Sequence, residues 1–173
     1  MVQTQIKTRV RAALACRIVN LDRVKFNDAV ASGTYPCAPM TMKGSARIFT
    51  EEQLLPLFFF ARLTEFGIPT GRAGQLACEM ASAASSDYAE PADRITFVQG
   101  MMSNFFTPSK IKVQSSSEIK VNYDPEHETH DKHYGAGRII FSIDFYIKHV
   151  REIIAERIEY ERSILGEDDE EPG

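Results

Sequence analysis

Long apolar runs are missing from this chain of 173 residues. A membrane-spanning helix needs roughly 18 consecutive apolar residues, and no stretch of the chain approaches that length. The first residues are basic and lack the apolar core of a signal peptide. The sequence therefore predicts a cytoplasmic protein that has no membrane partner.

Cysteine is scarce as well. The three cysteines, Cys16, Cys37 and Cys78, are odd in number, widely spaced and free of any C-x-x-C pattern. A disulfide framework is built from an even number of cysteines and a zinc knuckle from closely spaced pairs, so neither is indicated. We expect all three cysteines to be reduced and to serve as packing residues.

Signature motifs of enzymes are also absent. The sequence has no nucleophile elbow, phosphate-binding glycine loop or cysteine–histidine pair. His127, His130 and His133 have ligand chemistry, but their spacing brings them together only in a helix, and Pro125 and Gly135 frame a loop. We predict no enzyme, no metal and no cofactor. A metal-dependent hydrolase that uses these three histidines is the weaker alternative.

Charge is distributed unevenly along the chain. Residues 1–49 carry eight lysines and arginines against two aspartates, an excess of six positive charges, although the whole chain has a net charge of −4. Local rather than total charge decides whether a protein attracts nucleic acid. The acidic run at the other end repels itself, which predicts a disordered tail over residues 166–173.

The first half of the chain has helical periodicity. Apolar residues at every fourth position predict a helix over residues 6–19. Asn20 suits the left-handed conformation of a tight turn, and Asp22 can cap a second helix, which ends at Gly33. Short apolar or β-branched arms around a glycine then predict a hairpin over residues 37–49.

Two further helices are predicted after the hairpin. Thr50 and Gln53 form a capping box that opens a long apolar helix, and Gly67 closes it. A fourth helix begins at Pro69 or the next residue and continues through Met80. The alanine- and serine-rich stretch that follows indicates a helix end, a linker and a domain boundary.

The apolar period changes to two beyond this boundary, which indicates short strands. We expect them around residues 95–97, 111–113, 119–123 and 139–143, with a flexible loop over 124–137. A long amphipathic helix is then predicted from about residue 144 to 165. Its apolar stripe consists of Ile147, Val150, Ile154, Ile158 and Leu165.

The order helix, tight turn, helix, hairpin, helix, helix resembles the DNA-binding domain of MerR-family transcription regulators. Asn20-Leu21-Asp22 stands where that family has Gly-Val-Ser at the turn, and Gly33-Thr34-Tyr35-Pro36 resembles its Gly-Leu-Leu-Pro exit from the recognition helix. Residues 44–54 are similar to its wing-to-helix segment, in which an arginine and an aromatic residue precede an acidic helix start. The resemblance covers fewer than half of the residues.

The resemblance implies an α+β fold. A MerR-like winged helix-turn-helix domain over residues 1–84 is followed by a small antiparallel β segment and the long C-terminal helix over 92–165. Asp28 and Ala29 stand where the family has aromatic residues near the phosphate backbone, so the clamping of the backbone must differ. The apolar stripe of the last helix can pack on strands of its own chain or pair with a second subunit. We expect a homodimer, since a palindromic operator favours one.

The function implied by the resemblance is sequence-specific binding of double-stranded DNA. We expect a transcription regulator, with RNA polymerase as a further partner. Phage excisionases and small terminase subunits have a similar fold, so a phage-type architectural DNA-binding factor is the alternative. Cations that engage phosphates and forked donors that read base edges are the chemistry this function needs. The predicted DNA-binding residues are Arg17, Arg23, Lys25, Asn27, Lys43 and Arg47.

Overall fold

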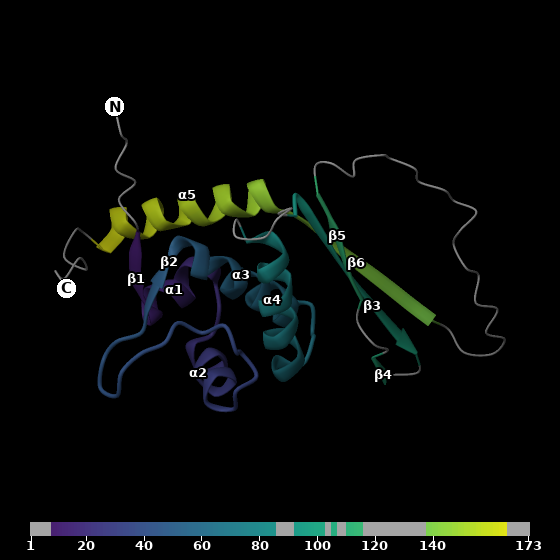
Figure 1. Cartoon of the computed structure of the whole chain (residues 1–173), viewed down its shortest axis with the longest axis horizontal. Coiled ribbons are helices and arrows are strands. Elements are labelled where there is room, and N and C mark those ends of the chain that lie inside the picture. Colours follow the sequence, from purple (N-terminus) through teal and green to yellow (C-terminus); the bar gives the residue numbers. More distant parts are fainter. Residues whose placement is uncertain (1–7, 86–91, 103–104, 107–109, 116–137, 166–173) are drawn as a thin grey trace.

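The computed structural model describes residues 8–85, 92–102, 105–106, 110–115 and 138–165 (Figure 1). These residues form five helices and two antiparallel sheets, which confirms the predicted α+β class. Several sequence predictions fall outside the described residues. They are the strand at 119–123, the loop at 124–137 with its three histidines, and the acidic tail at 166–173.

Two short helices joined by a tight turn lie near the start of the described chain. Helix α1 (Ala12–Val19) and helix α2 (Arg23–Ala31) are joined by a turn in which Asn20 is left-handed, with φ 57° and ψ 50°. The Asp22 carboxylate accepts hydrogen bonds from the second and third N–H groups of α2, at 2.8 and 3.0 Å. These groups have no partner inside the helix, so the acid satisfies them. The predicted turn and cap are both confirmed.

The segment before α1 is a strand and not the first turns of a helix. Strand β1 (Arg9–Arg11) pairs antiparallel with strand β2 (Ile48–Thr50), and Val10 lies opposite Phe49. The predicted helix start at residue 6 is therefore wrong. The apolar spacing that suggested it came from Val10, which is buried in this ladder, and its partner strand lies far along the chain.

The predicted hairpin at residues 37–49 is also wrong. Residues 32–47 form a single loop, and only the segment after it joins a sheet, where it pairs with β1. Pro36 and Pro39 interrupt the arm that would have been the first strand, and proline has no N–H to donate to a ladder. The winged arrangement expected from the resemblance thus lacks its hairpin in this part of the chain.

Helices α3 (Glu51–Glu65) and α4 (Thr70–Ala84) appear as predicted. The Gln53 side chain accepts the N–H of Thr50 at 2.9 Å, as a capping box requires, and Gly67 has the positive φ of +83° that ends α3. Helix α3 is buried on nearly all sides because it contacts α1, α4 and α5. It is the centre of the hydrophobic core.

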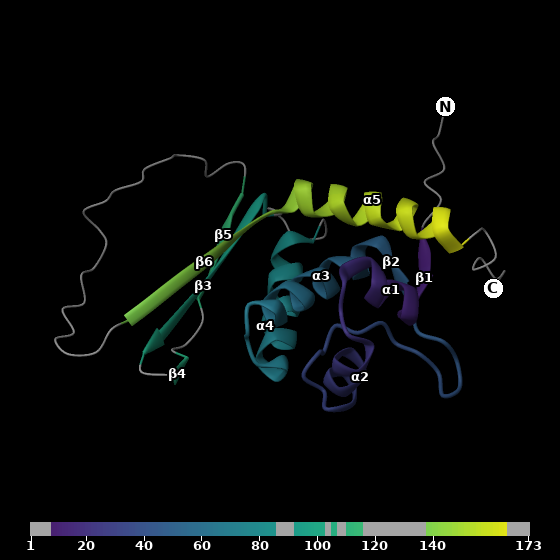
Figure 2. The ribbon, with the colours of Figure 1, turned by 180° about the vertical axis from the view of Figure 1, so that it is seen from behind.

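Four strands make the second sheet. Strand β3 (Arg94–Met102) pairs antiparallel with β4 (Phe105–Phe106), β5 (Lys110–Gln114) and β6 (Arg138–Tyr146). Strands β3 and β6 are longer than the sequence predicted, and together they extend away from the helices (Figures 1 and 2). Where β6 ends, the chain continues directly into the last helix.

Helix α5 (Ile147–Leu165) lies across α1 and α3 (Figure 1). Four residues of its apolar stripe are buried in the core of the same chain: Ile147, Val150, Ile154 and Ile158. The stripe was expected on the strands or on a second subunit, and it packs instead on the helix-turn-helix region. One hydrophobic cluster therefore runs from α1 to the sheet, across the predicted domain boundary.

Arginines of α5 reinforce this packing. Arg157 donates to the Ile18 carbonyl at 3.0 Å, and Arg151 donates to the Ala84 carbonyl at 3.1 Å and pairs with Glu52. Carbonyls in the last turn of a helix have no partner within the helix. A cation at that end also interacts favourably with the negative end of the helix dipole. Helix α5 thus caps both α1 and α4.

Cys37 and Cys78 form a disulfide, so the prediction of three reduced cysteines is wrong for these two. Helix α4 packs against the segment that leaves α2. A Cβ atom at Gly74 would lie 2.3 Å from the Thr34 carbonyl oxygen, so only glycine permits this approach. The two cysteine Cα atoms come within 5.7 Å, although 41 residues separate them in sequence. Cys16 is free and buried.

Candidate nucleic-acid interface

The outward face of α2 carries three of the predicted DNA-binding residues. Arg23, Lys25 and Asn27 are all exposed, because Phe26 and Ala29 take the inward positions of this short helix. Val24 is on the outward side as well and is 66% exposed. Figure 1 shows α2 at the edge of the molecule remote from α5. The face is therefore open to a partner.

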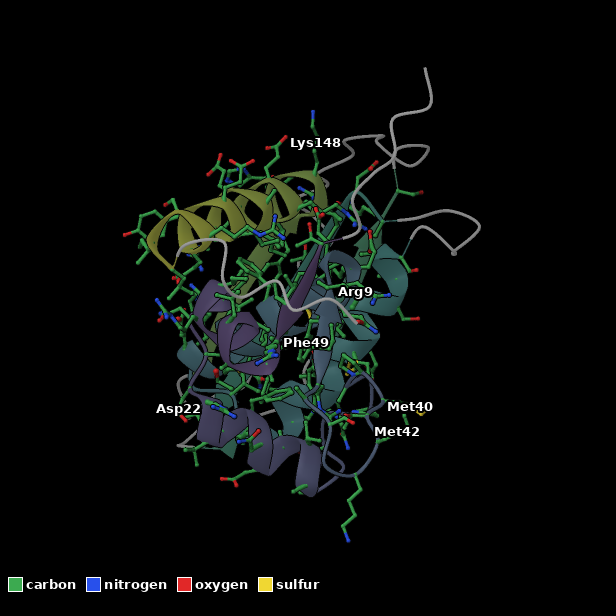
Figure 3. The ribbon with its side chains drawn as sticks, turned by 90° about the vertical axis from the view of Figure 1, so that its left-hand side faces the viewer. Arg9, Asp22, Met40, Met42, Phe49 and Lys148 are labelled. Atoms are coloured by element: carbon green, nitrogen blue, oxygen red, sulfur yellow. A yellow bond between two sulfur atoms is a disulfide. The ribbon has the colours of Figure 1, made fainter. Side chains whose placement is uncertain are left out.

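The loop of residues 32–47 lies beside α2 and brings a fourth predicted residue, Lys43, which is exposed. Met40 and Met42 are exposed in the same loop, at 99% and 80%. Figure 3 shows both methionines at the end of the molecule that carries α2, away from Lys148 on α5. We refer to α2 and residues 32–47 together as the α2 face.

The cations of the α2 face are not neutralised by the rest of the described chain. Arg23, Lys25 and Lys43 form no ion pair with any residue that the structure describes. The sequence between Asp28 and Glu51 contains no acidic residue. Residues 22–47 have four basic and two acidic side chains, an excess of two positive charges. The face is positive and solvated.

Two predicted DNA-binding residues are engaged within the chain. Arg17 pairs with Glu161 of α5 at 2.7 Å and is half exposed. The Arg47 guanidinium donates to the Pro39 carbonyl and braces the loop from within. The structure therefore brings Arg23, Lys25, Asn27 and Lys43 together on one face and does not leave the other two arginines free beside them.

Sequence reasoning missed the two exposed methionines. Their signal was present, since Met40 and Met42 stand in a segment between Pro39 and Gly44 that contains no other large apolar side chain. Methionine is ordinarily a core residue, so the sequence alone suggests that both side chains pack in the interior. Their exposure is the unusual property.

The core below α2 holds two buried ionisable groups. Burial raises the pKa of the Cys16 thiol to about 11, although the positive charge of Arg23 acts in the opposite direction. Burial also raises the pKa of Tyr35, whose ring packs edge to face on Phe26. The Tyr35 hydroxyl has no hydrogen-bond partner among the described residues. Both groups are neutral at physiological pH, and Tyr35 supports α2 through its contact with Phe26.

In the part of the chain that the structure covers, no three histidine, cysteine or acidic side chains are grouped to hold an ion, and the three predicted histidine ligands lie outside it. Among the described helices, none is both long and apolar enough to cross a bilayer.

No protein-family model matches this chain, and no curated protein sequence is significantly similar to it. The resemblance to MerR-type domains therefore rests on the residues of the turn, of the exit from α2 and of the start of α3.

Proposed function

We propose that this protein binds double-stranded DNA through the α2 face and acts as a sequence-specific transcription regulator. The observation that carries the proposal is the outward row Arg23, Lys25 and Asn27 on the second helix of a helix-turn-helix unit. In DNA-binding units of this kind the N-terminal part of the second helix meets base edges in the major groove. Arg23 and Lys25 are the first and third residues of α2.

The dimensions of α2 suit that groove. An α-helix with its side chains is about 10 to 12 Å across, and the major groove is about 12 Å wide, so a helix can lie in it. Arginine is a forked donor that matches the two acceptors of guanine, and the asparagine amide matches adenine. Lys25 and Lys43 supply point charges for phosphates. The four exposed residues thus cover both base reading and backbone contact.

Several parts of the regulator proposal involve partners besides DNA. A symmetric operator requires two copies of the chain, and any dimer interface must use a surface other than the α5 stripe, because that stripe is buried within one chain. A regulator also acts on RNA polymerase. A cytoplasmic location belongs to the same proposal, although disulfides such as Cys37–Cys78 are uncommon in that compartment.

The test is selection from a random duplex library, followed by titration of the selected duplex at several salt concentrations. We expect log affinity to fall linearly with log salt, because each phosphate contact releases a counterion. Affinity that does not depend on salt, or a library from which nothing is enriched, would contradict DNA binding.

Three single variants, one of them a matched control, locate the interface. Arg23→Ala should cost about 1 to 3 kcal/mol on the selected duplex and relax its sequence preference, since a base contact is lost. Lys25→Ala should weaken binding to all duplexes by a similar factor and lower the slope of log affinity against log salt by about one. The control is Lys148→Ala, an exposed lysine on α5 at the other side of the molecule (Figure 3). Equal effects of the two lysine variants would place the interface elsewhere.

A further inference from the structure

The part of the 32–47 loop that carries Met40 and Met42 is held in place on both sides. Cys37 is bonded to Cys78 of α4, and the Ala12 N–H donates to the Arg47 carbonyl at 3.0 Å where the loop meets β1. The Arg47 side chain then reaches across to the Pro39 carbonyl. These contacts fix where the loop leaves the molecule and in which direction its tip points.

The tip of the loop is a hydrogen-bonded turn. The Ser45 N–H donates to the Met42 carbonyl at 3.0 Å, and the Thr41 hydroxyl donates to the Ser45 carbonyl at 3.1 Å. Gly44 has a φ of +86°, which glycine adopts without strain. These bonds hold the turn together, and Met40 and Met42 both lie in water beside it.

Two apolar side chains held in water at the tip of a pinned loop gain free energy when a partner covers them. The chemistry around them restricts that partner. Lys43 follows Met42 directly, and no acidic residue occurs anywhere between Asp28 and Glu51. A suitable surface must therefore combine negative charge with a narrow apolar slot. A base-pair step between two phosphate backbones has both properties, and several minor-groove binders insert apolar wedges there.

We propose that Met40 and Met42 form a wedge that enters the minor groove beside the segment read by α2, separates a base step and bends the duplex. Lys43 binds the flanking phosphate. The inference rests on the proposed DNA binding and adds to it a mode of action, since a protein that bends its site changes the path of the DNA as well as marking a sequence.

The test compares the unmodified protein with the double variant Met40→Gln/Met42→Gln on the selected duplex. Glutamine keeps the length and the neutral charge of methionine, and both positions are exposed, so the melting temperature should not change. Bending is measured as energy transfer between dyes at the two ends of a duplex of about 30 base pairs, a length over which groove-binding proteins produce measurable bends. Separation of the step is measured with 2-aminopurine in the duplex.

We expect the double variant to lose the bend and the 2-aminopurine signal and to bind about tenfold more weakly, with the salt slope unchanged because no phosphate contact is removed. Lys43→Gln should lower the salt slope by about one and retain the bend. The matched control is Ile164→Gln, since Ile164 is 55% exposed near the far end of α5 and should affect neither measurement.

Three outcomes would overturn the wedge. If the unmodified protein binds the duplex and the double variant retains both the affinity and the bend, DNA binding stands and the wedge is wrong. If the unmodified protein binds no duplex, the proposed function fails and the wedge fails with it. If vesicles of phosphatidylserine and phosphatidylcholine bind the unmodified protein but not the double variant, while DNA affinity is equal for both, the methionines serve a lipid surface instead.

Discussion

The two sides of the helix-turn-helix unit use their cations in opposite ways. On the side covered by α5, arginines donate hydrogen bonds to backbone carbonyls of the same chain or form ion pairs with its carboxylates. On the α2 face, Arg23, Lys25 and Lys43 have no ion pair within the described residues, and two methionines lie in water. The amino-acid composition does not distinguish these two groups of cations. The difference indicates that the cations of the covered side contribute to stability, whereas those of the α2 face remain in solvent.

The end of α1 shows how complete the covered side is. Its last four carbonyls accept, in chain order, from the N–H of Leu21, from the N–H of Asn20, from Arg157 and from Arg62. Arg62 comes from α3 and also stacks over the Phe58 ring, and burial lowers its pKa while Glu65 opposes that shift. Every orphan group of that helix end has a donor, which is the arrangement of a structural interface.

The largest expected effect tests whether the α5 stripe belongs to this interface. Ile154 is 1% exposed, so Ile154→Asp places a carboxylate in an apolar core and should destabilise the protein by about 4 kcal/mol or more. Urea denaturation followed by circular dichroism measures the loss. Ile164→Asp, at an exposed position of the same helix, is the control and should change stability little. A folded Ile154→Asp monomer would show instead that the stripe pairs with a second subunit.

Local signals in the sequence predicted the caps and turns at the helix ends well. Asp22, Thr50 and Gly67 act through atoms within a few residues, and all three appear in the roles that their spacing indicates. The outward face of α2 also follows from local periodicity, because Phe26 and Ala29 fix its inward side. The part of the candidate site that lies on α2 was therefore predictable from its own segment.

Contacts between distant segments were not predictable in the same way. The partner of β2 is a strand near the start of the chain, and the apolar stripe of α5 covers helices whose residues are far from it in sequence. The engagement of Arg17 depends on Glu161, which no local pattern around α1 reveals. Such pairings are set by how complete elements pack, so single-segment periodicity contains no information about them.

The second prediction concerns the bond that joins the α2 face to the body of the protein. Replacing both Cys37 and Cys78 by serine should lower the unfolding free energy by about 3 kcal/mol, since the crosslink restricts the unfolded chain. Reductant should destabilise the unmodified protein by a similar amount and leave the double variant unaffected. Denaturation curves with and without dithiothreitol give both values. A curve of the unmodified protein that is insensitive to reductant would show that the bond is not formed in solution.

The third prediction separates the two kinds of arginine directly. Arg157→Ala removes a charged donor from the Ile18 carbonyl and should cost about 2 kcal/mol of stability, whereas Arg23→Ala on the exposed face should cost less than about 0.5. On DNA the order should reverse, because Arg23 is the proposed base contact. Thermal denaturation and duplex titration of both variants provide the comparison. Similar losses of stability from the two variants would remove the distinction between the faces.

The smallest effect is expected below α2, at the Tyr35 hydroxyl. The group is buried and has no hydrogen-bond partner in the described part of the chain, so Tyr35→Phe removes a desolvated polar group and should stabilise the protein by about 1 kcal/mol. The aromatic contacts with Phe26 and Phe60 are kept. The control is Tyr160→Phe, because Tyr160 is 63% exposed and its hydroxyl is solvated.

The advantage of Tyr35→Phe should grow at alkaline pH. Burial raises the pKa of Tyr35 in the folded protein, so the folded state keeps the phenolic proton that the unfolded chain loses above about pH 10. The unmodified protein therefore loses up to about 1.4 kcal/mol per pH unit above that value relative to the variant, and nothing below it. Denaturation of both proteins at pH 8, 10 and 11 measures the difference in their stability. The contributions of the other titrating groups are the same in both proteins and cancel. A Tyr35→Phe variant that is less stable at pH 8 would show that the hydroxyl has a partner, such as a buried water.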